Sequence, residues 1–367
     1  MSTKRFRVGF VGLQPGRSWG TRAHLPALDG LKDDFEITGV ANSTAGSARK
    51  AASDLSLPRA FDNVEDLVAS PDVDVIAVTV KVPHHYDIVS SALAAGKHVY
   101  CEWPLGNGLE EARKLADQAR RAGVVAVVGT QALFAPEVRH LRSLIEQGYL
   151  GEVLSTSLIG VGGTWGAAIP SASAYTLDRG NGANLMTIPV GHSLAALTHV
   201  LGPVADVSAI LSTRRQIVHS ADTEEVWPAT SPDQVVVSAR LGNGAPLSLH
   251  FRGGEARGTG FCWEVNGTLG DLRLTGVRGQ SQLVQLTLEG GTGETPYAVI
   301  APPSTGDDAA AGPVVGNVRR LYAAMADDLR NGTRSAPTFD DAVAIHQILA
   351  AIEMAAETGE RAQPANM

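Results

Sequence analysis

Residues 8–28 read VGFVGLQPGRSWGTRAHLPAL, an apolar run followed by a glycine-rich turn and an amphipathic segment. This order is typical of a β-strand that turns into a helix, where backbone N–H groups and the helix N-terminus can face a pyrophosphate. The spacing departs from GxGxxG, because Gln14 stands where the second glycine belongs and the loop is about two or three residues longer. Taken alone, the loop fits an ordinary strand-to-helix turn as well as it fits a nucleotide site.

The chain around this loop decides between those two interpretations. Amphipathic stretches separate the first apolar run from four more, at residues 35–43, 73–80, 97–103 and 124–130. That alternation predicts an α/β fold with a doubly wound parallel sheet, a Rossmann domain over residues 1–130. In such a domain the glycine-rich loop is the expected site of a dinucleotide.

The pattern changes after Thr130. We expect a helix, a strand, a second helix around His192 and then β-rich segments, at 136–147, from 152, and with hairpin turns at 242–244 and 266–271. Residues 213–232 and 302–316 are polar and are predicted to be long surface loops. The segment 131–367 is therefore interpreted as a separate α+β domain for substrate binding and oligomerisation. Its last helix, 339–356, is a candidate to pack back on the first domain.

Composition limits the class of protein. The chain has 367 residues, 44% of them hydrophobic and 19% charged, with a formal net charge of -8. Two packed domains are the expectation for that length. No sustained basic patch is present to neutralise phosphates, which argues against nucleic acid as a partner.

Cysteine content and hydropathy bear on location. Cys101 and Cys262 are far apart, so the sequence indicates neither a disulfide framework nor a metal site, and a reducing cytoplasm fits. The N-terminal run is short and broken by glycine, and is interpreted as a strand and not as a signal peptide. No run approaches the ~18 apolar residues that span a bilayer, so no membrane association is expected.

The end of the second apolar run bears on the choice of cofactor. An NAD-selective enzyme usually places an acidic residue there for the ribose 2'-hydroxyl, but this chain has Asn42, Ser43 and Thr44. Arg49 and Lys50 follow and can add positive charge for a 2'-phosphate, although either can equally belong to a solvated helix face. The sequence favours NADP, with NAD as the alternative.

Three longer motifs carry a family resemblance: EWPLG (102–106), FAPEVRHLRSLIEQGYLGEV (134–153) and GNGANLMTIPVGHSLAALTHVLG (180–202). With them the chain resembles the glucose–fructose oxidoreductase, inositol dehydrogenase and MocA (Gfo/Idh/MocA) family. VKVPHHYD (80–87) and FRGG (251–254) resemble the branch that includes the fungal galactose-regulon repressor, some of whose members bind NAD(P) and transmit a signal. The resemblance implies an open C-terminal sheet, mostly antiparallel, a cofactor between the domains, and a homodimer or homotetramer formed through that sheet.

The departures from the family pattern concern proton transfer. The lysine of the family's EKP motif is Trp103 here, and only the histidine, His192, remains of its DxGxH pair, since Ile188 stands where the aspartate belongs. The usual linker arginine is Leu133. An enzyme with a non-standard site and a protein that only binds are both consistent with these changes.

Three residues are candidates for catalysis. His192 is the best remaining base, because imidazole titrates near neutral pH, although a core histidine on an apolar helix is the alternative. Lys81 follows the 73–80 strand and can supply a relocated cation, or bind cofactor ribose, or point to solvent. Tyr175 leads toward the His192 helix and can bind a hydroxyl group.

The loop and the family motifs together predict two sets of binding residues. For the cofactor they are Gly12, Leu13, Gly16, Ser18, Trp19, Asn42, Ser43, Thr44, Val80, Lys81, His85, Glu102, Trp103 and Gln131. For the substrate they are Trp103, Trp165, Tyr175, Asp178, Asn184 and His192. Burial in the domain interface explains the tryptophans as well as ligand contact does, and a turn explains Asp178 equally well.

Three functions compete. The first is an NADP-dependent oxidoreductase for a sugar, a polyol or another small carbonyl compound. The second is a non-catalytic NAD(P)-binding sensor whose partner is a protein. The third is a lyase or isomerase that recycles its own hydride.

Overall fold

The structure is a computed structural model of the chain and describes residues 4–303 and 311–367. Its contacts divide the chain into two compact units. The first comprises Met1–Thr130 with Val314–Val343, and the second comprises Gln131–Pro313 with Ala344–Met367. Each unit therefore contains a late segment of the chain as well as an early one.

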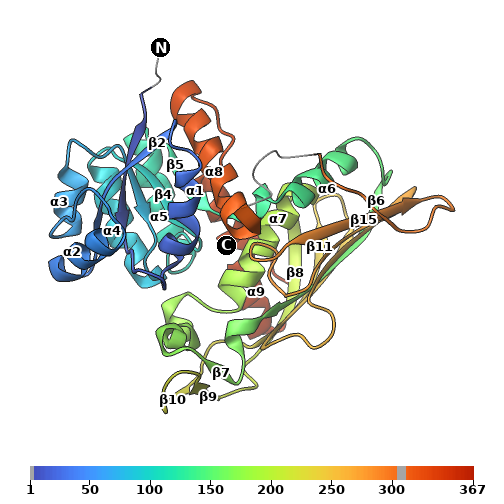
Figure 1. Cartoon of the computed structure of the whole chain (residues 1–367). Helices are drawn as coiled ribbons and strands as arrows, with labels where there is room; N and C mark the ends of the chain where they lie inside the picture. The colour runs from blue at the N-terminus through green and yellow to red at the C-terminus, as the bar shows by residue number, and fades with distance from the viewer. Residues whose placement is uncertain (1–3, 304–310) are drawn as a thin grey trace. The chain divides into compact units, whose positions relative to one another are not determined.

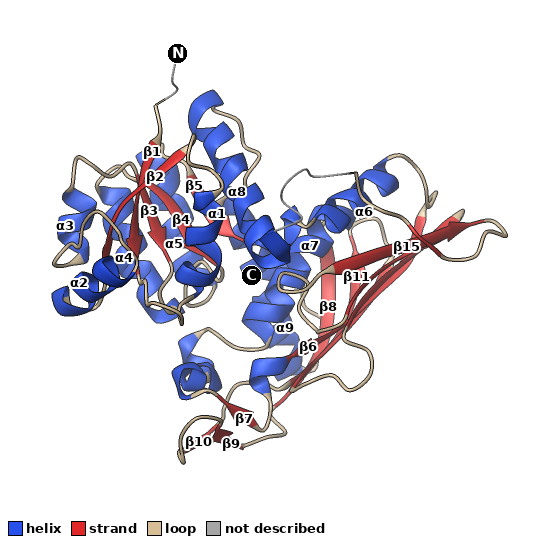
Figure 2. Ribbon diagram, in the orientation of Figure 1, coloured by secondary structure: helices blue, strands red, loops and turns tan. Residues whose placement is uncertain are grey.

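The first unit is built on a parallel sheet of five strands in the order β2-β1-β3-β4-β5, with helices on both sides (Figure 2). The strands are β1 (Phe6–Val11), β2 (Phe35–Ala41), β3 (Val75–Val78), β4 (His98–Glu102) and β5 (Ala126–Gly129). Every residue of β3 is buried, because a parallel sheet covered on both faces leaves no polar side to its central strands. The predicted Rossmann sheet is confirmed.

The helices of this unit bury one apolar stripe each. In α5 (Leu109–Ala122) the buried residues are Ala112, Leu115, Ala116 and Ala119, the spacing of one helix face. The other elements are the π-helix η1 (Gly20–His24), α1 (Leu25–Asp29), α2 (Ala45–Asp54), α3 (Val64–Ala69), the 3-10 turn η2 (Val82–His84), α4 (His85–Ala94) and most of α8 (Gly312–Asn331). Because α8 begins at Gly312, the prediction of a loop over 302–316 is wrong at its end, and residues 304–310 of it lie outside the described residues.

The second unit contains a mixed sheet in the order β16-β15-β14-β13-β6-β12-β11-β8 (Figure 1). Strands β6 and β12 run parallel, and the other neighbours run antiparallel. The predicted α+β fold with an open, mostly antiparallel sheet is confirmed. The strands are β6 (Val153–Gly162), β8 (Val204–Ser212), β11 (Gln234–Leu241), β12 (Pro246–Gly253), β13 (Phe261–Gly267), β14 (Gly270–Gly276), β15 (Leu286–Thr292) and β16 (Ala298–Val299).

One face of this sheet is covered and the other is not. Along β11, Val235, Val237 and Ala239 are buried, while Val236 and Ser238 between them are exposed. Helix α6 (Pro136–Glu146) lies against β14, β15 and α7 (Gly191–Leu201) on the covered face. The last helix, α9 (Phe339–Thr358), is divided between the two units after Val343. Short helices make up the connections: η3 (Gln131–Phe134), η4 (Gly163–Trp165), η5 (Ser171–Leu177), η6 (Arg179–Asn181), the π-helix η7 (Met186–Val190) and η9 (Pro364–Asn366).

The polar segment 213–232 is not a loop throughout. It contains β9 (Ile217–Ser220) and β10 (Val226–Pro228), which join β7 (Ala168–Ile169) in a small sheet. Val218 packs with Ile169 and Leu177 in a core of its own, with Trp227 against it. The prediction of a surface loop is wrong here, because a few apolar side chains within a polar segment suffice to hold a hairpin against a neighbouring strand.

Neither a membrane-spanning helix nor a cluster of metal ligands occurs in the described residues. Within residues 4–303 and 311–367, no helix combines the length and the apolarity needed to cross a bilayer. The same described residues contain no group of three or more His, Cys, Asp or Glu side chains placed to hold a metal ion.

Candidate functional site

The glycines of the first loop are explained by close approach and by backbone conformation. Gly12 has φ 98°, and a Cβ on it would lie 2.5 Å from Val80 Cγ1 at the end of β3. Gly20 starts η1, where a Cβ would lie 2.5 Å from Leu13 Cδ2. Gly16 has φ 67° and open space around it. The loop is therefore pressed against the sheet at both ends and open at Gly16, a shape that fits an approaching pyrophosphate.

Side chains within the loop hold it in this shape. Gln14 N–H donates to Ser18 Oγ (2.9 Å), and Thr21 Oγ1 donates to the Gln14 carbonyl (3.1 Å). Ser18, a predicted cofactor residue, thus closes the loop on itself. Trp19 Nε1 is buried and has no hydrogen-bond partner among the described residues. A donor in that state is available to a ligand, and the loop fits a dinucleotide on this count also.

The residues at the end of β2 have mostly structural tasks. Asn42 Oδ1 accepts from Leu13 N–H (3.0 Å) and Asn42 Nδ2 donates to the Leu13 carbonyl (2.9 Å), which ties β2 to the glycine loop. Thr44 caps helix α2 through a reciprocal capping box with Ser47. Ser43 is exposed. Of the three neutral residues predicted to face the ribose, Ser43 is the one whose side chain makes no hydrogen bond with the described residues.

The two cations proposed for a 2'-phosphate are both in ion pairs. Arg49 Nη1 lies 2.9 Å from Asp62 Oδ1, and Lys50 Nζ lies 2.8 Å from Asp54 Oδ2. All four side chains are exposed, and exposed pairs contribute little free energy, so a phosphate can compete for either cation. The interpretation of both residues as a solvated helix face gains weight from these partners.

The EWPLG turn is fixed from behind by a buried polar network. His24 Nε2 lies 2.9 Å from Glu102 Oε1, and His24 Nδ1 lies 2.9 Å from Tyr322 Oη on α8. With a proton on Nε2, the imidazole donates to Glu102, and its Nδ1 can accept from the Tyr322 hydroxyl. The Tyr322 ring stacks on Tyr100, with centroids 4.6 Å apart. Burial and then the charge of Glu102 raise the pKa of both tyrosines well above the usual value. Glu102 is thereby held in one orientation.

A second histidine braces the same turn. His85 is buried, with Nδ1 2.8 Å from the Pro104 carbonyl and Nε2 3.1 Å from the Val80 carbonyl. Burial lowers its pKa, so the ring is neutral and can donate to one carbonyl at a time. Trp103 itself is 4% exposed, whereas Lys81, just beyond β3, is exposed. Strands β3 and β4 are paired, with Val78 opposite Cys101, so both residues leave the sheet at neighbouring strand ends.

Trp165 and the segment of Asn184 lie near the end of β6. A Cβ on Gly162 would lie 2.6 Å from Trp165 Cε3 and 2.4 Å from Leu185 Cδ1, which places the Trp165 ring beside the segment that leads into α7. Asn184 is buried, and its Oδ1 accepts from the N–H groups of Met186 and Thr187 at the start of η7. Gln131, at the start of η3, is buried with an Oε1 that lacks a partner among the described residues.

His192 lies in the first turn of α7 and is 3% exposed. Its Nδ1 has no hydrogen-bond partner in the described chain, and neither has Trp165 Nε1. Burial lowers the pKa of His192 from 6.5 to about 3, so the ring is neutral near pH 7 and carries a lone pair. A buried, unsatisfied polar atom costs about 1–3 kcal/mol unless a ligand satisfies it.

Tyr175 and Asp178 stand on the short helices before α7. Tyr175 is half-buried, which raises the pKa of its hydroxyl, and its carbonyl accepts from Asn181 Nδ2 (2.7 Å). Asp178 is exposed and accepts from Gly180 N–H (2.9 Å) as the cap of η6. This cap agrees with the interpretation of Asp178 as a turn residue. The roles of Tyr175, Trp103 and Lys81 toward a ligand stay predictions.

Sequence reasoning missed His24 and Tyr322. His24 is in the 8–28 stretch, but the partner that gives it a task lies 298 residues further along the chain. Tyr322 lies on a helix, α8, that was not predicted. No local pattern in the sequence connects the two.

Known families and proteins match this chain over both units. The sequence model described as "Oxidoreductase family, NAD-binding Rossmann fold" matches residues 6–130, and that described as "Gal80p, C-terminal domain" matches residues 136–276. The galactose/lactose metabolism regulatory protein GAL80 of Kluyveromyces lactis is 30% identical over 307 residues, 78% of this chain and 67% of that protein. The dehydrogenase aclE of Aspergillus oryzae is 32% identical over 285 residues, 75% of this chain and 78% of that protein. A crystal structure of a super-repressor mutant of Gal80p from Saccharomyces cerevisiae superposes with a TM-score of 0.90 at 26% identity, covering 99% of both chains.

Proposed function

Because this chain belongs to the Gfo/Idh/MocA oxidoreductase family, in the branch that resembles Gal80, we propose that it is a nicotinamide-dependent oxidoreductase for a small hydroxylated or carbonyl compound. The sugar or polyol class of substrate is part of this proposal. The observation that carries it is His192, a buried neutral imidazole with an unsatisfied nitrogen at the family's histidine position.

Each unit has its own task in this proposal. The loop from Gly12 to Trp19 would hold the pyrophosphate, and Glu102, fixed by His24, would set the position of the EWPLG turn. When bound, the cofactor supplies or accepts a hydride. His192 would take or return the proton of the substrate hydroxyl, for which its low pKa must rise when ligands bind. Lys81 and Tyr175 would bind the substrate or its proton.

The test compares two histidines of equal burial. His192→Ala and His346→Ala both remove a fully buried ring whose pKa is lowered to about 3, but His346 lies on α9, outside the family motif. In a screen of NADP+ and NAD+ reduction against aldoses, ketoses, inositols and simple dicarbonyls, His192→Ala should lower kcat about 100-fold or more, the scale of a general base. His346→Ala should lose stability and keep its kcat. Equal kcat in the two variants would remove His192 from the mechanism.

A preference for NADP over NAD belongs to the same proposal. It is supported by the absence of an acidic residue after β2 and by the exposed Ser43 at the start of α2. The exposed pairs of Arg49 and Lys50 can exchange a carboxylate for a 2'-phosphate. The affinities for NADPH and NADH, measured side by side, decide the preference.

A second function has its own support. A non-catalytic NAD(P)-binding regulator is favoured by Trp103 at the position of the family's lysine, and by the likeness to GAL80 over both units. Cofactor binding without turnover of any compound in the screen, together with a protein that co-purifies with the cofactor-bound chain, would select the regulator.

The predicted self-association through the C-terminal sheet is also proposed. Ile210, Val236 and Ile159 are exposed and lie in one register row across the uncovered face. Ile210→Asp should shift sedimentation toward the monomer without unfolding the chain. We also place the protein in the cytoplasm, because Cys101 and Cys262 are free thiols.

A further inference from the structure

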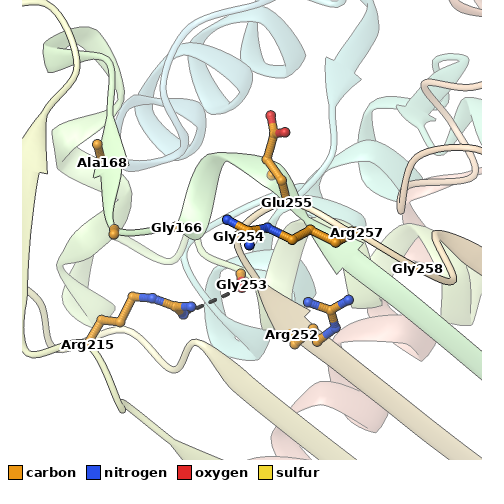
Figure 3. A pocket seen from close by; sticks show the side chains of 11 residues that line it. Gly166, Ala168, Arg215, Arg252, Gly253, Gly254, Glu255, Arg257 and Gly258 are labelled. Atoms are coloured by element: carbon orange, nitrogen blue, oxygen red, sulfur yellow. Dashed lines mark hydrogen bonds between the residues drawn. The ribbon is translucent and has the colours of Figure 1, made fainter.

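The second unit contains a hollow of ≈ 570 Å³ at the carboxyl ends of β6 and β12 (Figure 3). These two strands are parallel and end in register, with Gly253 opposite Gly162. A volume of this size is within the range of small-molecule pockets, about 300–1,000 Å³. It is far larger than a single inorganic ion requires.

Glycine allows two segments of backbone to approach closely beside this hollow. A Cβ on Gly253 would lie 2.1 Å from the Trp165 carbonyl oxygen, and one on Gly166 would lie 3.2 Å from Gly254 Cα. The chain that passes from η4 to β7 therefore crosses the strand ends at backbone contact distance.

The rim is positively charged. Arg215, Arg252 and Arg257 line the hollow together with one carboxylate, Glu255. In Figure 3, Arg215 extends toward Gly253 from one side and Arg257 from the other. Because Arg215 is paired with the buried Asp233, three guanidinium groups stand against two carboxylates, which leaves one positive charge in excess.

The three arginines differ in how they are held. Arg215 Nη1 lies 3.1 Å from Oδ2 of the buried Asp233, which also accepts from the N–H groups of Arg214 and Arg215. Its position is therefore fixed by the fold. The guanidinium groups of Arg252 and Arg257 make no hydrogen bond or ion pair with any residue in 4–303 or 311–367. Two guanidinium groups without protein partners beside a fixed one leave several N–H donors for an anion.

We propose that this hollow binds the phosphate group of a small phosphorylated compound of sugar-phosphate size. A phosphate ester offers three acceptor oxygens and close to two negative charges, which matches forked donors from several directions better than one carboxylate does. The rest of the hollow holds the organic part. The site goes beyond the proposed oxidoreductase or regulator function and does not depend on it. A phosphorylated substrate and a phosphorylated signal molecule would bind to the same arginines.

The experiment is calorimetric titration of the full chain without nicotinamide cofactor, in phosphate-free buffer. The probes are glucose 6-phosphate, inorganic phosphate and glucose. Glucose 6-phosphate should bind saturably and more tightly than the other two. Arg252→Gln combined with Arg257→Gln should weaken it about tenfold or more, because two charge-assisted hydrogen bonds are lost. Glu255→Gln should strengthen it, because a like charge is removed.

Arg278→Gln is the matched control, since Arg278 is an exposed arginine of the same unit that does not line the hollow. It should bind the probe as the parent does, and the melting temperatures of all variants should show that they fold. No saturable binding of glucose 6-phosphate, or equal binding by the double variant, would overturn the site. Equally tight binding of inorganic phosphate or of glucose would overturn the ligand class. Because no cofactor is present, these outcomes are independent of the proposed function.

Discussion

The candidate site residues of the two units differ in how far the protein itself satisfies their polar groups. In the first unit, Asn42, Thr44, His85 and Glu102 have partners within the protein, whereas Trp19 Nε1 has none among the described residues. In the second unit, nitrogens of His192 and Trp165 are buried without described partners. Two arginines of the hollow are likewise unpaired within the described chain. This difference supports the proposal that the first unit would hold a cofactor mainly through backbone and shape, and that the second would hold a substrate through side chains.

The largest expected effect comes from a substitution in the first unit. Trp103→Lys puts the family's lysine back, but at a position that is 4% exposed. A buried cation without a built partner, and the loss of a large ring, should lower the free energy of unfolding by about 3–5 kcal/mol. Urea denaturation measures the change, and Trp103→Phe, which keeps an apolar ring, should lose less.

Stability and activity of that variant together show which role Trp103 has. If Trp103→Lys is as stable as the parent and gains dehydrogenase activity, the tryptophan merely replaced an acid in an otherwise intact site. If it unfolds or stays inactive, Trp103 belongs to the packing of the turn, and the site works without that lysine.

The next effect concerns the network behind Glu102. His24→Ala leaves both Glu102 and Tyr322 without their histidine and should cost about 2–3 kcal/mol, the scale of buried polar groups left unsatisfied. NADPH affinity should fall as well, because the side chain of Glu102, a predicted cofactor residue, is no longer held in one position. The control is His84→Ala, an exposed histidine on η2, which should change stability by less than about 0.5 kcal/mol. An unchanged stability of His24→Ala would show that the network carries no weight.

Low pH tests the buried histidines of the second unit. The pKa values of His192 and His346 are lowered from 6.5 to about 3 in the folded chain. Between those pH values the unfolded chain binds more protons than the folded chain, so the free energy of unfolding must fall as pH falls. Each histidine should contribute about 1.4 kcal/mol per pH unit over that window. Denaturation in urea at pH 7 and at lower pH measures the slope, which His192→Gln and His346→Gln should each reduce. A slope that neither variant changes would contradict the burial of neutral rings.

The sequence predicted the parts of the molecule that follow from local pattern. The five apolar runs became the parallel strands because burial on both faces demands continuous apolar residues, as in β3. Helix α8 was missed because the polar segment before it resembles a loop up to its first residues. Contacts between residues far apart in the sequence could not be predicted, because no local pattern links the partners. His24 and Tyr322 are 298 residues apart, and Arg49 on α2 pairs with Asp62 in the loop before α3. By contrast, the Lys50–Asp54 pair follows from helical i,i+4 spacing alone.

The smallest effect sharpens the comparison within two adjacent residues. Ser43→Asp adds a carboxylate at an exposed position, so stability should be unchanged, while the preference for NADPH over NADH should reverse by several-fold. Asn42→Asp adds the same charge one residue earlier, but it also replaces the Nδ2 donor to the Leu13 carbonyl with an acceptor. That variant should lose about 1–2 kcal/mol of stability and weaken both cofactors, because the brace to the glycine loop is broken. Fluorescence titration with each cofactor and urea denaturation separate the two outcomes. If Ser43→Asp leaves the order of affinities unchanged, the residues at the end of β2 do not select between the two cofactors by their ribose. The proposed NADP preference must then be abandoned.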